Sequence, residues 1–392
     1  MKIILLIHHE NTLGYSMNRY GNFILEGMCK RGHNIEVWAP KLYLSKYKFP
    51  AGINKWLRYI DQYLIFPIYF KKKSKVLDKN VLFVLIDQAL SMWMPLIRKK
   101  NHIVHCHDFI ALKSALGTIK ENPTSTSGKI YQKLILRGLN MANNFVCISN
   151  NTKQDLLYFL KKKPIRVEQV YNALHPIFVP GNMENARIVL GKHMKLDLKH
   201  GYILHVGGNT FYKNRIGVIT LYNAWRDISE KVLPLIMIGY KPSTNISVYY
   251  ERSPYKEDIY FLEDADDNLL SYAYQGGSVF VFPSLEEGFG FPIIEAMAAG
   301  CPVLTTNKAP MNEIGGSAAI YLKRSPNDKK LLAWALQSAK VIENILQLND
   351  EERSNLIHKG LDNISKFDEN IILNHLEEIY LDVLANHHTN KL

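Results

Sequence analysis

The feature of the sequence that most constrains the fold is a repeated alternation of short apolar runs with segments of helical periodicity. Five such runs lie in the first half of the chain, and a second series starts after Gly201. They are KIILLIHH (2–9), NIEVWAP (34–40), VLFVLI (81–86), HIVHCHD (102–108), NNFVCIS (143–149), YILHVGG (202–208), LPLIMIGY (233–240), DIYFLE (258–263), SVFVFPS (278–284), CPVLTTN (301–307) and AAIYL (318–322). Apolar runs of this length between helical segments are typical of parallel strands whose two faces are covered by helices. We therefore expect an α/β protein with doubly wound parallel sheets.

The length of the chain predicts two such domains. The sequence has 392 residues, whereas a typical single domain has about 100–200 residues. The second series of apolar runs agrees with this division. Because ligands of doubly wound sheets bind beyond the carboxyl ends of the strands, we expect a cleft where the strand ends of the two domains meet.

Composition points to a soluble globular protein. Hydrophobic residues make up 47% and charged residues 21% of the chain, which is ordinary for that class. No run approaches the ~18 apolar residues that span a bilayer, and the first run is too short for the core of a signal peptide. The four cysteines are far apart, so we expect buried free thiols rather than disulfides or a zinc site. These observations predict a cytoplasmic protein.

Two cofactor classes are disfavoured by missing motifs. The turn after the first run reads HHENTLGYSMNRYG, without the GxGxxG that a nicotinamide-binding domain carries there. Gly128-Lys129 has Pro123 and Ile130 where a Walker A loop needs glycine and Ser or Thr. The sequence therefore predicts neither a nicotinamide oxidoreductase nor a P-loop nucleotidase.

The segment LEEGFGFPIIEAMAAG (285–300) forms a glycine-rich turn between an expected strand and a helix. Pro292 suits the first turn of that helix. Free N–H groups at a helix start, together with the positive end of its dipole, attract phosphate. Gly288 and Gly290 allow unusual backbone angles and a close approach of a ligand to the main chain. The turn is therefore a candidate phosphate site.

Two carboxylates, Glu287 and Glu295, flank this turn. A carboxylate repels phosphate but accepts strong hydrogen bonds from sugar hydroxyls, so a nucleotide-sugar fits the arrangement. From spacing alone, an alternative is that Glu287 is a solvated loop acid and that Glu295 only complements the helix dipole. Glu286 lies one residue out of the spacing, and we expect it to be a surface acid.

The string PSLEEGFGFPIIEAMAAGCPVLTTN (283–307) closely resembles the E-x(7)-E signature of family 4 retaining glycosyltransferases, also called glycosyltransferase group 1. The strings YILHVGGNTFYKN (202–214), DDNLLSYAYQGGSVFVFPS (266–284) and APMNEIGGSAAIYL (309–322) also resemble segments of that family. The resemblance implies the GT-B fold, in which two doubly wound Rossmann-like domains face each other across a cleft and a C-terminal helix crosses back to the first domain. The implied domains are an acceptor-binding domain (1–180), a nucleotide-sugar-binding domain (181–367) and the final helix (368–392).

The same resemblance implies roles for individual residues. Glu287 would contact the hexose hydroxyls, Glu295 the ribose, and Lys213 the donor diphosphate, with Glu287, Lys213 and His107 as catalytic-site residues. The implied donor-binding residues are Gly14, Gly207, Gly208, Lys213, Asn214, Gly288, Phe289, Gly290, Phe291 and Glu295.

The sequence also departs from the family pattern at three positions. Many members have an arginine where this chain has Gly208, and others have a basic residue where it has Tyr212. The N-terminal Gly-Gly pair of many relatives is reduced to Gly14. We therefore expect Arg215 or backbone amides to assist Lys213.

Polar residues also follow two apolar runs of the N-terminal half. His105 and His107 are two residues apart in a strand and so face the same side, which fits a metal site or a structural role in the core. The family resemblance instead favours His107 at the catalytic site. Asp87 and Gln88, after the run 81–86, are candidate acceptor-binding residues.

A possible metal motif lies in the C-terminal half. Asp264-x-Asp266 has the form of a metal-binding pair, but it precedes a helical segment, where an aspartate is an ordinary N-cap. Lys213 and a helix N-terminus already supply positive charge to a diphosphate. We therefore expect no metal.

The net charge of +12 is concentrated in the N-terminal half. Residues 41–100 contain thirteen Lys or Arg and three Asp, and the segment KWLRYIDQYLIFPIYFKKKSK (55–75) mixes aromatic with basic residues. This segment fits an anionic membrane surface, with aromatic rings at headgroup depth and lysines on lipid phosphates. Stacking platforms for nucleic acid and a solvated helix face are the alternatives, of which we favour the membrane.

The sequence thus predicts a retaining, metal-independent hexosyltransferase without a cofactor. It would move a hexose from a UDP- or GDP-sugar to a glycan or lipid-linked acceptor in cell-surface polysaccharide synthesis. We expect it in the cytoplasm or peripherally on the cytoplasmic face of the membrane, with no nucleic-acid partner. Alternatives are another two-domain sugar-nucleotide enzyme of epimerase or phosphorylase type and a basic nucleic-acid-binding protein.

Overall fold

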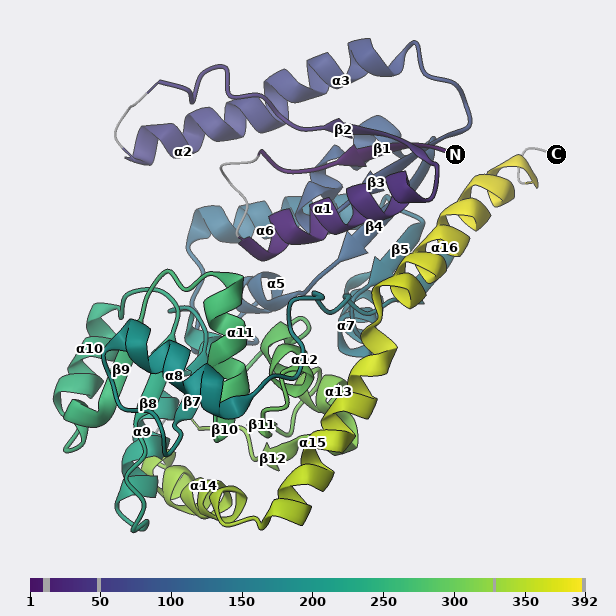
Figure 1. Cartoon of the computed structure of the whole chain (residues 1–392). Helices are drawn as coiled ribbons and strands as arrows, with labels where there is room; N and C mark the ends of the chain where they lie inside the picture. Colours follow the sequence, from purple (N-terminus) through teal and green to yellow (C-terminus); the bar gives the residue numbers. More distant parts are fainter. Residues whose placement is uncertain (10–14, 48–50, 327–328, 390–392) are drawn as a thin grey trace. The chain divides into compact units, whose positions relative to one another are not determined.

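The chain forms two compact units in a computed structural model that describes residues 1–9, 15–47, 51–326 and 329–389 (Figure 1). The N-terminal unit comprises Met1–Asn172 and the C-terminal segment Asn370–Leu392, and the C-terminal unit comprises Ala173–Glu369. Each unit is an α/β domain built on one six-stranded parallel sheet.

The sheet of the N-terminal unit has the strand order β2-β1-β3-β4-β5-β6. Its strands are β1 (Lys2–Leu6), β2 (Asn34–Trp38), β3 (Val81–Leu85), β4 (Asn101–Cys106), β5 (Asn144–Cys147) and β6 (Arg166–Gln169). Its helices are α1 (Tyr15–Lys30), α2 (Ala51–Ile60), α3 (Phe66–Ser74), α4 (Met94–Ile97), α5 (Ile110–Ala115), α6 (Thr126–Leu139), α7 (Asn150–Phe159) and α16 (Glu369–Thr389), with the π-helix η2 (Asp61–Ile65) and the 3₁₀ helix η3 (Gln88–Trp93). The strand order reverses between β1 and β3.

The sheet of the C-terminal unit has the order β12-β11-β10-β7-β8-β9. Its strands are β7 (Ile203–Val206), β8 (Leu235–Ile238), β9 (Ile259–Leu262), β10 (Val279–Phe282), β11 (Val303–Thr306) and β12 (Ile320–Leu322). Its helices are α8 (Met183–Met194), α9 (Arg215–Arg226), α10 (Thr244–Glu251), α11 (Asp267–Gly276), α12 (Phe291–Ala298), α13 (Met311–Gly315), α14 (Leu331–Leu346) and α15 (Asp350–Ile364), with the 3₁₀ helices η4 (Phe211–Lys213), η5 (Lys256–Asp258), η6 (Gly316–Ala318) and η7 (Ser365–Phe367). The order reverses between β7 and β10, as in a Rossmann fold.

Continuous apolar sequence explains the central strands. Every residue of β3, β8 and β10 is apolar and buried, because helices cover both faces of a parallel sheet. Trp225 and Tyr222 of α9 are fully buried in the core beside the sheet of the C-terminal unit. The sequence-based expectation of doubly wound parallel sheets is confirmed.

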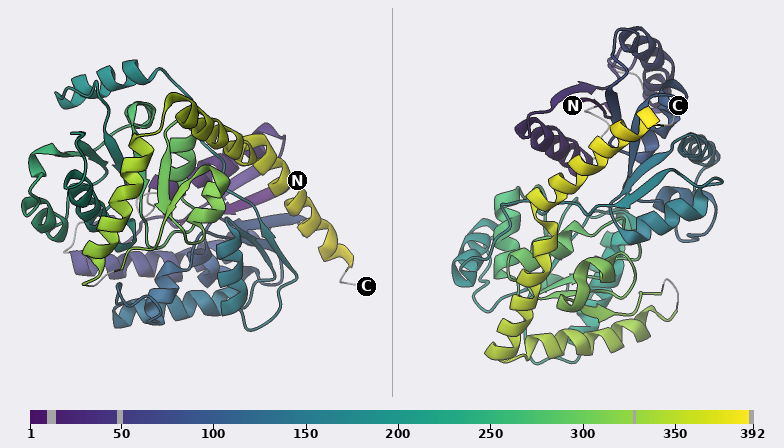
Figure 2. Two further views of the ribbon diagram at one scale, coloured as in Figure 1. Left: turned by 90° about the horizontal axis from the view of Figure 1, so that it is seen from below. Right: turned by 90° about the vertical axis from the view of Figure 1, so that its right-hand side faces the viewer.

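The last helix packs on the N-terminal unit, as expected. α16 passes close to α1 in Figure 1 and in the right-hand view of Figure 2, and Leu373 occupies the space that a side chain at Gly27 would need. Glu377 of α16 contacts His33 at 2.6 Å, and the hydroxyl of Tyr380 lies 2.9 Å from Nε2 of His105. α16 is therefore part of the core of the first unit.

The cysteines follow the expectation with one exception. All four are free, and Cys106, Cys147 and Cys301 are buried. Cys29 is exposed because it lies on the solvent face of the last turn of α1. The expectation that all four thiols are buried was therefore wrong for Cys29.

Candidate functional site

Lys213 and Glu287 meet at the carboxyl edge of the C-terminal sheet. Lys213 ends η4, which follows β7, and Glu287 lies in the turn after β10. β7 and β10 are neighbours at the point where the strand order reverses, and this position is where doubly wound sheets bind ligands. The Lys213 ammonium donates to Oε1 of Glu287 at 2.8 Å and lies 4.9 Å from the centre of the Phe282 ring.

Two further hydrogen bonds join the loops that carry these residues. The backbone N–H of Leu285 donates to the carbonyl of Tyr212 at 2.7 Å. The side-chain amide of Asn214 donates to the carbonyl of Pro283 at 3.0 Å. Asn214 itself has a positive φ of 55°, a conformation that asparagine tolerates better than most residues. The sequence-predicted residues Lys213, Asn214 and Glu287 thus belong to one connected structure.

The glycine-rich turn leads directly into α12. Gly290 precedes the helix with a φ of 114°, which a residue with a Cβ rarely adopts, and Pro292 lies in the first turn. The ring of Phe289 is buried against Phe291 and Phe367, with centroids 5.1 and 5.7 Å apart. Phe289 therefore anchors the turn, and what residues 288–291 offer a ligand here is their backbone.

Glu295 lies in the second turn of α12, where it is 5% exposed. The hydroxyl of Tyr274, on α11, donates to its Oε2 at 3.1 Å. Glu287 is 9% exposed. Both carboxylates are therefore held in low-exposure positions on either side of one helix start, and the alternative that Glu287 is a solvated loop acid is wrong.

Glu286 is not the surface acid that the sequence predicted. Its side chain is 8% exposed and forms an ion pair with Lys308, while Arg324 lies 3.9 Å away. Lys308 also donates to the backbone carbonyl of Leu285. Glu286 therefore binds the turn to the loop after β11, an arrangement that spacing within one segment cannot reveal.

The loop after β7 is packed tightly against the loop after β8. A Cβ on Gly239 would lie 2.3 Å from the carbonyl oxygen of Gly207, and one on Gly208 would lie 3.3 Å from the ring of Tyr240. The Nη1 of Arg215 donates to the carbonyl of Tyr240 at 2.8 Å. Gly208 thus leaves room for Tyr240, whereas an arginine there would not fit without displacing that ring.

Arg215 and His205 are buried below these glycines. Burial lowers the pKa of Arg215 to about 10, although Glu263 opposes the shift. Its Nε and one Nη have no hydrogen-bond partner among the described residues. Burial also lowers the pKa of His205 to about 3, against the opposing hydrogen bond of its Nδ1 to Val281. His205 is therefore neutral beside the site.

A second polar cluster lies at the carboxyl edge of the N-terminal sheet. His8 follows β1, Asp87 follows β3 and His107 follows β4. The strand order reverses between β1 and β3, and β4 is the neighbour of β3. His8 Nε2 lies 2.9 Å from Oδ2 of Asp87, whose Oδ1 accepts from Ala89 N at 2.8 Å. Burial raises the pKa of the Asp87 carboxyl, but the hydrogen bond and charge of His8 outweigh it and hold the pKa below its usual value.

The side chain of Gln88 is hydrogen-bonded to the backbone of His107 and Asp108. Gln88 accepts from the His107 N–H at 2.8 Å and donates to the carbonyl of Asp108 at 2.9 Å. His107 Nε2 donates to the carbonyl of Ile86 at 2.7 Å, since a carbonyl can only accept. Burial lowers the pKa of His107, against the opposing charge of Asp87. The neutral ring therefore presents Nδ1 as a hydrogen-bond acceptor.

His105 has a structural role. It is fully buried, with Nδ1 2.5 Å from the hydroxyl of Tyr20 and Nε2 2.9 Å from that of Tyr380. Burial lowers its pKa to about 3. His105 thus joins α1, β4 and α16, and the structural alternative for it is confirmed.

The metal alternatives find no support in the part of the chain that the structure describes. No group of three His, Cys, Asp or Glu residues is placed to hold an ion there. Asp266 caps α11 by accepting from Leu269 N at 2.7 Å, as the N-cap alternative predicted. Gly14 lies outside the described residues.

Sequence reasoning missed His8, whose contact with Asp87 joins residues 79 positions apart. It also missed an aromatic cluster in the same unit, in which Tyr59 stacks on Tyr131 with ring centres 5.8 Å apart and Tyr63 hydrogen-bonds to Tyr131 at 2.8 Å. The His-His pair at the end of the first apolar run was the one available signal for His8.

The basic and aromatic segment forms one helical stretch, α2-η2-α3 (Figure 1). Its buried face holds Phe66 and Phe70. Four large apolar residues, Ile53, Trp56, Leu64 and Ile68, are each more than half exposed. Lys71 and Lys72 are exposed, whereas Lys73 pairs with Glu36 and lies 4.6 Å from the Trp38 ring. Among the described residues, no helix combines the length and hydropathy required to cross a bilayer.

The comparison with protein families matches residues 200–340 to the family "Glycosyl transferases group 1". This segment contains Lys213, Glu287 and Glu295. The resemblance that the sequence motifs predicted is therefore confirmed for residues 200–340, which match the glycosyl transferases group 1 model.

Known proteins with similar sequences include two bacterial mannosyltransferases. The O-antigen chain mannosyltransferase B of Escherichia coli is 28% identical over 53% of this chain and 54% of its own length. The O-antigen chain mannosyltransferase RfbU of Salmonella typhimurium is 26% identical over 58% of each chain. The chain thus spans little more than half the length of these two relatives.

Solved structures share the fold over nearly the whole chain. Anabaena HepE, crystallised in complex with UDP and glucose, has a TM-score of 0.70 at 12% identity and covers 96% of this chain and 98% of its own. At that identity the likeness shows the fold alone. Together with the two parallel sheets, it shows that the chain has the two Rossmann-like domains of the GT-B fold.

Proposed function

We propose that the protein is a retaining glycosyltransferase that moves a hexose from a nucleotide-diphosphate sugar to a glycan or lipid-linked acceptor in cell-surface polysaccharide synthesis. The observation that carries the proposal is the arrangement at the β7–β10 reversal point. There Lys213 contacts Glu287 in the turn before α12, and Glu295 lies in the second turn of that helix. The lysine and the helix N-terminus suit the negative charge of a diphosphate, and the two carboxylates suit the hydroxyl groups of the sugars on either side of it.

In this proposal the C-terminal unit binds the donor. One of the three N–H groups of Lys213 is directed at Glu287, which leaves two for the diphosphate. The backbone N–H groups at the start of α12 supply further donors. Glu295 accepts from the ribose hydroxyls and Glu287 from the hexose hydroxyls. The charge that develops on the leaving diphosphate is stabilised by the groups that bind it, so no metal is needed.

The N-terminal unit would bind the acceptor. Asp87 and the Nδ1 of His107 are hydrogen-bond acceptors at the carboxyl edge of its sheet, suited to sugar hydroxyls. Gln88 positions His107, because both ends of its amide contact the backbone of residues 107 and 108. In a retaining reaction the acceptor attacks from the face that the diphosphate leaves, and a diphosphate oxygen takes the acceptor proton.

The relatives indicate which hexoses to test first. Two are named mannosyltransferases, and the Anabaena structure holds UDP and glucose. A thermal-shift screen of UDP- and GDP-linked mannose, glucose and related hexoses should find one donor that stabilises the wild type and stabilises Glu295→Ala much less. Equal shifts for both proteins would contradict the assigned donor site.

The reaction type is tested with the donor from that screen. We expect transfer to an acceptor that persists in EDTA and gives a product with the anomeric configuration of the donor, read by proton NMR. An inverted product would rule out retention, and loss of activity in EDTA would rule out metal independence. Conversion of the donor sugar to an isomer without acceptor would favour the epimerase alternative.

We also propose that α2-η2-α3 binds an anionic membrane surface on the cytoplasmic side. The exposed apolar side chains of Ile53, Trp56, Leu64 and Ile68 would enter the headgroup region, while Lys71 and Lys72 pair with lipid phosphates. Flotation with vesicles containing phosphatidylglycerol should show binding of the wild type that falls with salt.

Two double variants test this surface. Lys71→Glu/Lys72→Glu should lose vesicle binding and leave Lys73 in its contact with Glu36. Lys340→Glu/Lys359→Glu changes the same charge at two exposed lysines of α14 and α15 and should bind like the wild type. If both double variants float equally well, the segment is only a solvated helix face.

A further inference from the structure

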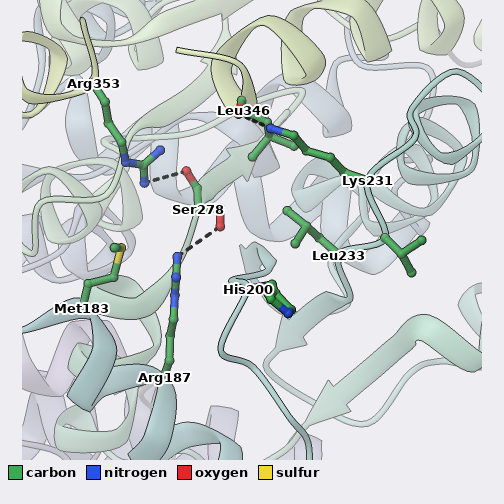
Figure 3. Close-up of a pocket in the computed structure, with 9 residues that line it drawn as sticks. Met183, Arg187, His200, Lys231, Leu233, Ser278, Leu346 and Arg353 are labelled. Atoms are coloured by element: carbon green, nitrogen blue, oxygen red, sulfur yellow. Dashed lines mark hydrogen bonds between the residues drawn. The ribbon is translucent and has the colours of Figure 1, made fainter. Parts of the chain in front are cut away.

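A pocket lined by basic and apolar residues lies in the C-terminal unit, away from Lys213 and Glu287. Its volume is about 450 Å³, and Figure 3 shows the residues that line it. They are Met183, Arg187, His200, Lys231, Val232, Leu233, Ser278, Leu346 and Arg353. A volume of this size is within the range of small-molecule sites, about 300–1,000 Å³.

The pocket lies at the amino-terminal edge of the sheet. His200 precedes β7, Leu233 precedes β8, and Ser278 directly precedes β10. Because the strands are parallel, these three residues share one edge, whereas Lys213 and Glu287 follow β7 and β10 at the other. A four-residue strand separates the two edges by roughly 13 Å. The pocket is therefore distinct from the candidate donor site.

Two arginines from different helices converge on Ser278 in this pocket (Figure 3). Arg187 of α8 donates to its hydroxyl at 3.4 Å, and Arg353 of α15 donates to its carbonyl at 3.0 Å. Burial lowers the pKa of Arg187, and the positive charge of Arg353 lowers it further, with an opposing effect of Tyr202. The two guanidinium groups thus repel each other, and an anion placed between them would relieve that repulsion.

The pocket contains a third cation and no acid. Lys231 donates one N–H to the carbonyl of Leu346, and His200 lies on the same lining, which has no Asp or Glu. Glu184 contributes only a minor interaction to Arg187 and lines a neighbouring pocket instead. Glu343 interacts with the charge of Lys231, but it is not part of the lining and its carboxylate accepts from Trp225 and Gln347, each at 2.8 Å.

Unused donors remain for a ligand. A guanidinium has five N–H groups and an ammonium three. Within the described chain, Arg187 uses three of its five for Gly276, Lys199 and Ser278, and Arg353 uses one. Lys231 keeps two. Planar guanidinium groups suit phosphate oxygens, which can accept two parallel hydrogen bonds from each.

The remaining lining is apolar. Met183, Val232, Leu233 and Leu346 complete the wall beside the cations, and they provide a surface for an uncharged body. We propose that this pocket binds a small soluble molecule that carries a phosphate or diphosphate group, with the phosphate on Arg187, Arg353 and Lys231 and the organic part on the apolar wall.

Calorimetric titration of the full chain with pyrophosphate tests the proposal. The titration uses a Lys213→Gln background, so that the candidate donor site does not contribute. We expect one binding event, which Lys231→Gln/Arg353→Gln weakens at least tenfold. Lys359→Gln, which removes an exposed charge from the same helix as Arg353, should leave it unchanged. Equal binding by these two variants would overturn the proposal.

Folding and ligand source are controlled separately. Arg353→Lys keeps the charge but not the planar pair of donors, so it should weaken binding less than Arg353→Gln does. Equal loss in these two variants would indicate a structural role and contradict the proposal. Hexose 1-phosphate should compete with pyrophosphate. Binding only to vesicles containing phosphatidic acid, with none to pyrophosphate, would also contradict it. None of these outcomes depends on glycosyl transfer, so a failure here leaves the proposed function untouched.

Discussion

Lys213 and Glu287 are partners in the structure and have opposite roles in the proposed reaction. The ammonium is attractive to a diphosphate, whereas the carboxylate 2.8 Å away is repulsive to it. Glu287 is 9% exposed, so its charge is only weakly screened by water. The pair therefore favours a donor whose neutral hexose, and not its phosphate, lies against Glu287.

The first prediction follows from this pair. Glu287→Gln keeps the shape of the side chain and removes its charge. Transfer should fall about 100-fold or more, because an aligned acceptor for the hexose hydroxyls is weakened in the transition state, whereas the Kd of the nucleoside diphosphate should stay equal or decrease. Steady-state kinetics and calorimetry measure the two quantities. Glu251→Gln, at an exposed pair with Lys256, is the control, and near-normal turnover of Glu287→Gln would contradict the assigned role.

Glu295 gives a second prediction, at the ribose. If its carboxylate accepts from ribose hydroxyls, wild type should bind the nucleoside diphosphate about tenfold more tightly than its 2′- or 3′-deoxy analogue, since a hydrogen bond to a charged group is worth about 1.5–3 kcal/mol. Glu295→Ala should bind natural and deoxy nucleotides equally. Tyr274→Phe, which removes the hydroxyl 3.1 Å from Glu295, should keep the preference in weakened form. A variant that still discriminates would place the ribose elsewhere.

At the scale of the element, α6 and η3 approach each other through a glycine. A Cβ on Gly138 would lie 2.0 Å from the carbonyl oxygen of Ser91, and the Ser91 hydroxyl donates to the carbonyl of Ile135 at 2.8 Å. Because the obstacle is backbone, no side-chain rotation removes the clash. η3 also begins at Gln88, so its position sets that of the candidate acceptor residues.

We therefore predict that Gly138→Ala lowers the free energy of unfolding by about 1–3 kcal/mol, the range for overpacked cores. Urea unfolding of the full chain measures the change. The matched control is Gly360→Ala in α15, where the atom nearest to an added Cβ would be the Cβ of Met297, at 3.5 Å. That variant should be neutral or stabilised by up to about 1 kcal/mol. Equal stability of the two variants would refute the argument from close approach.

Strands were predictable from the sequence where both faces are covered. β3 and β10 are apolar at every position, so their runs stand out. β6 was missed because its sequence, RVEQ, lies at the sheet edge and all four residues are only partly buried. An edge strand packs on fewer neighbours, and its sequence therefore carries little apolar signal.

At the scale of the whole molecule, the predictability of a site depends on how far apart its residues lie along the chain. Glu287, Gly290 and Glu295 lie within one strand-turn-helix, so local sequence was enough to place them together. The His8–Asp87 contact requires the order β2-β1-β3, which no pattern of apolar runs specifies. The pocket around Ser278 likewise needs three loops and three helices to meet at one sheet edge.

The two units also share one response to acid, which gives the last prediction. His105 in the N-terminal unit and His205 in the C-terminal unit are both fully buried, and burial lowers the pKa of each to about 3. In the unfolded chain a histidine has a pKa of about 6.5. Between pH 6.5 and 3 the unfolded state therefore binds more protons than the folded state, and stability must fall as pH decreases through that window.

Well below pH 6.5 each histidine should cost about 1.4 kcal/mol of stability per pH unit. Urea unfolding at pH 7.5, 6.0 and 5.0 measures this slope. His105→Gln, which does not titrate, should reduce the slope for the N-terminal unit only, and His205→Gln should do so for the C-terminal unit only. His193→Gln, at an exposed position in α8, should leave both slopes unchanged. If the slopes of all three variants match that of the wild type, the acid response arises from other groups, and the two buried histidines do not couple folding to pH.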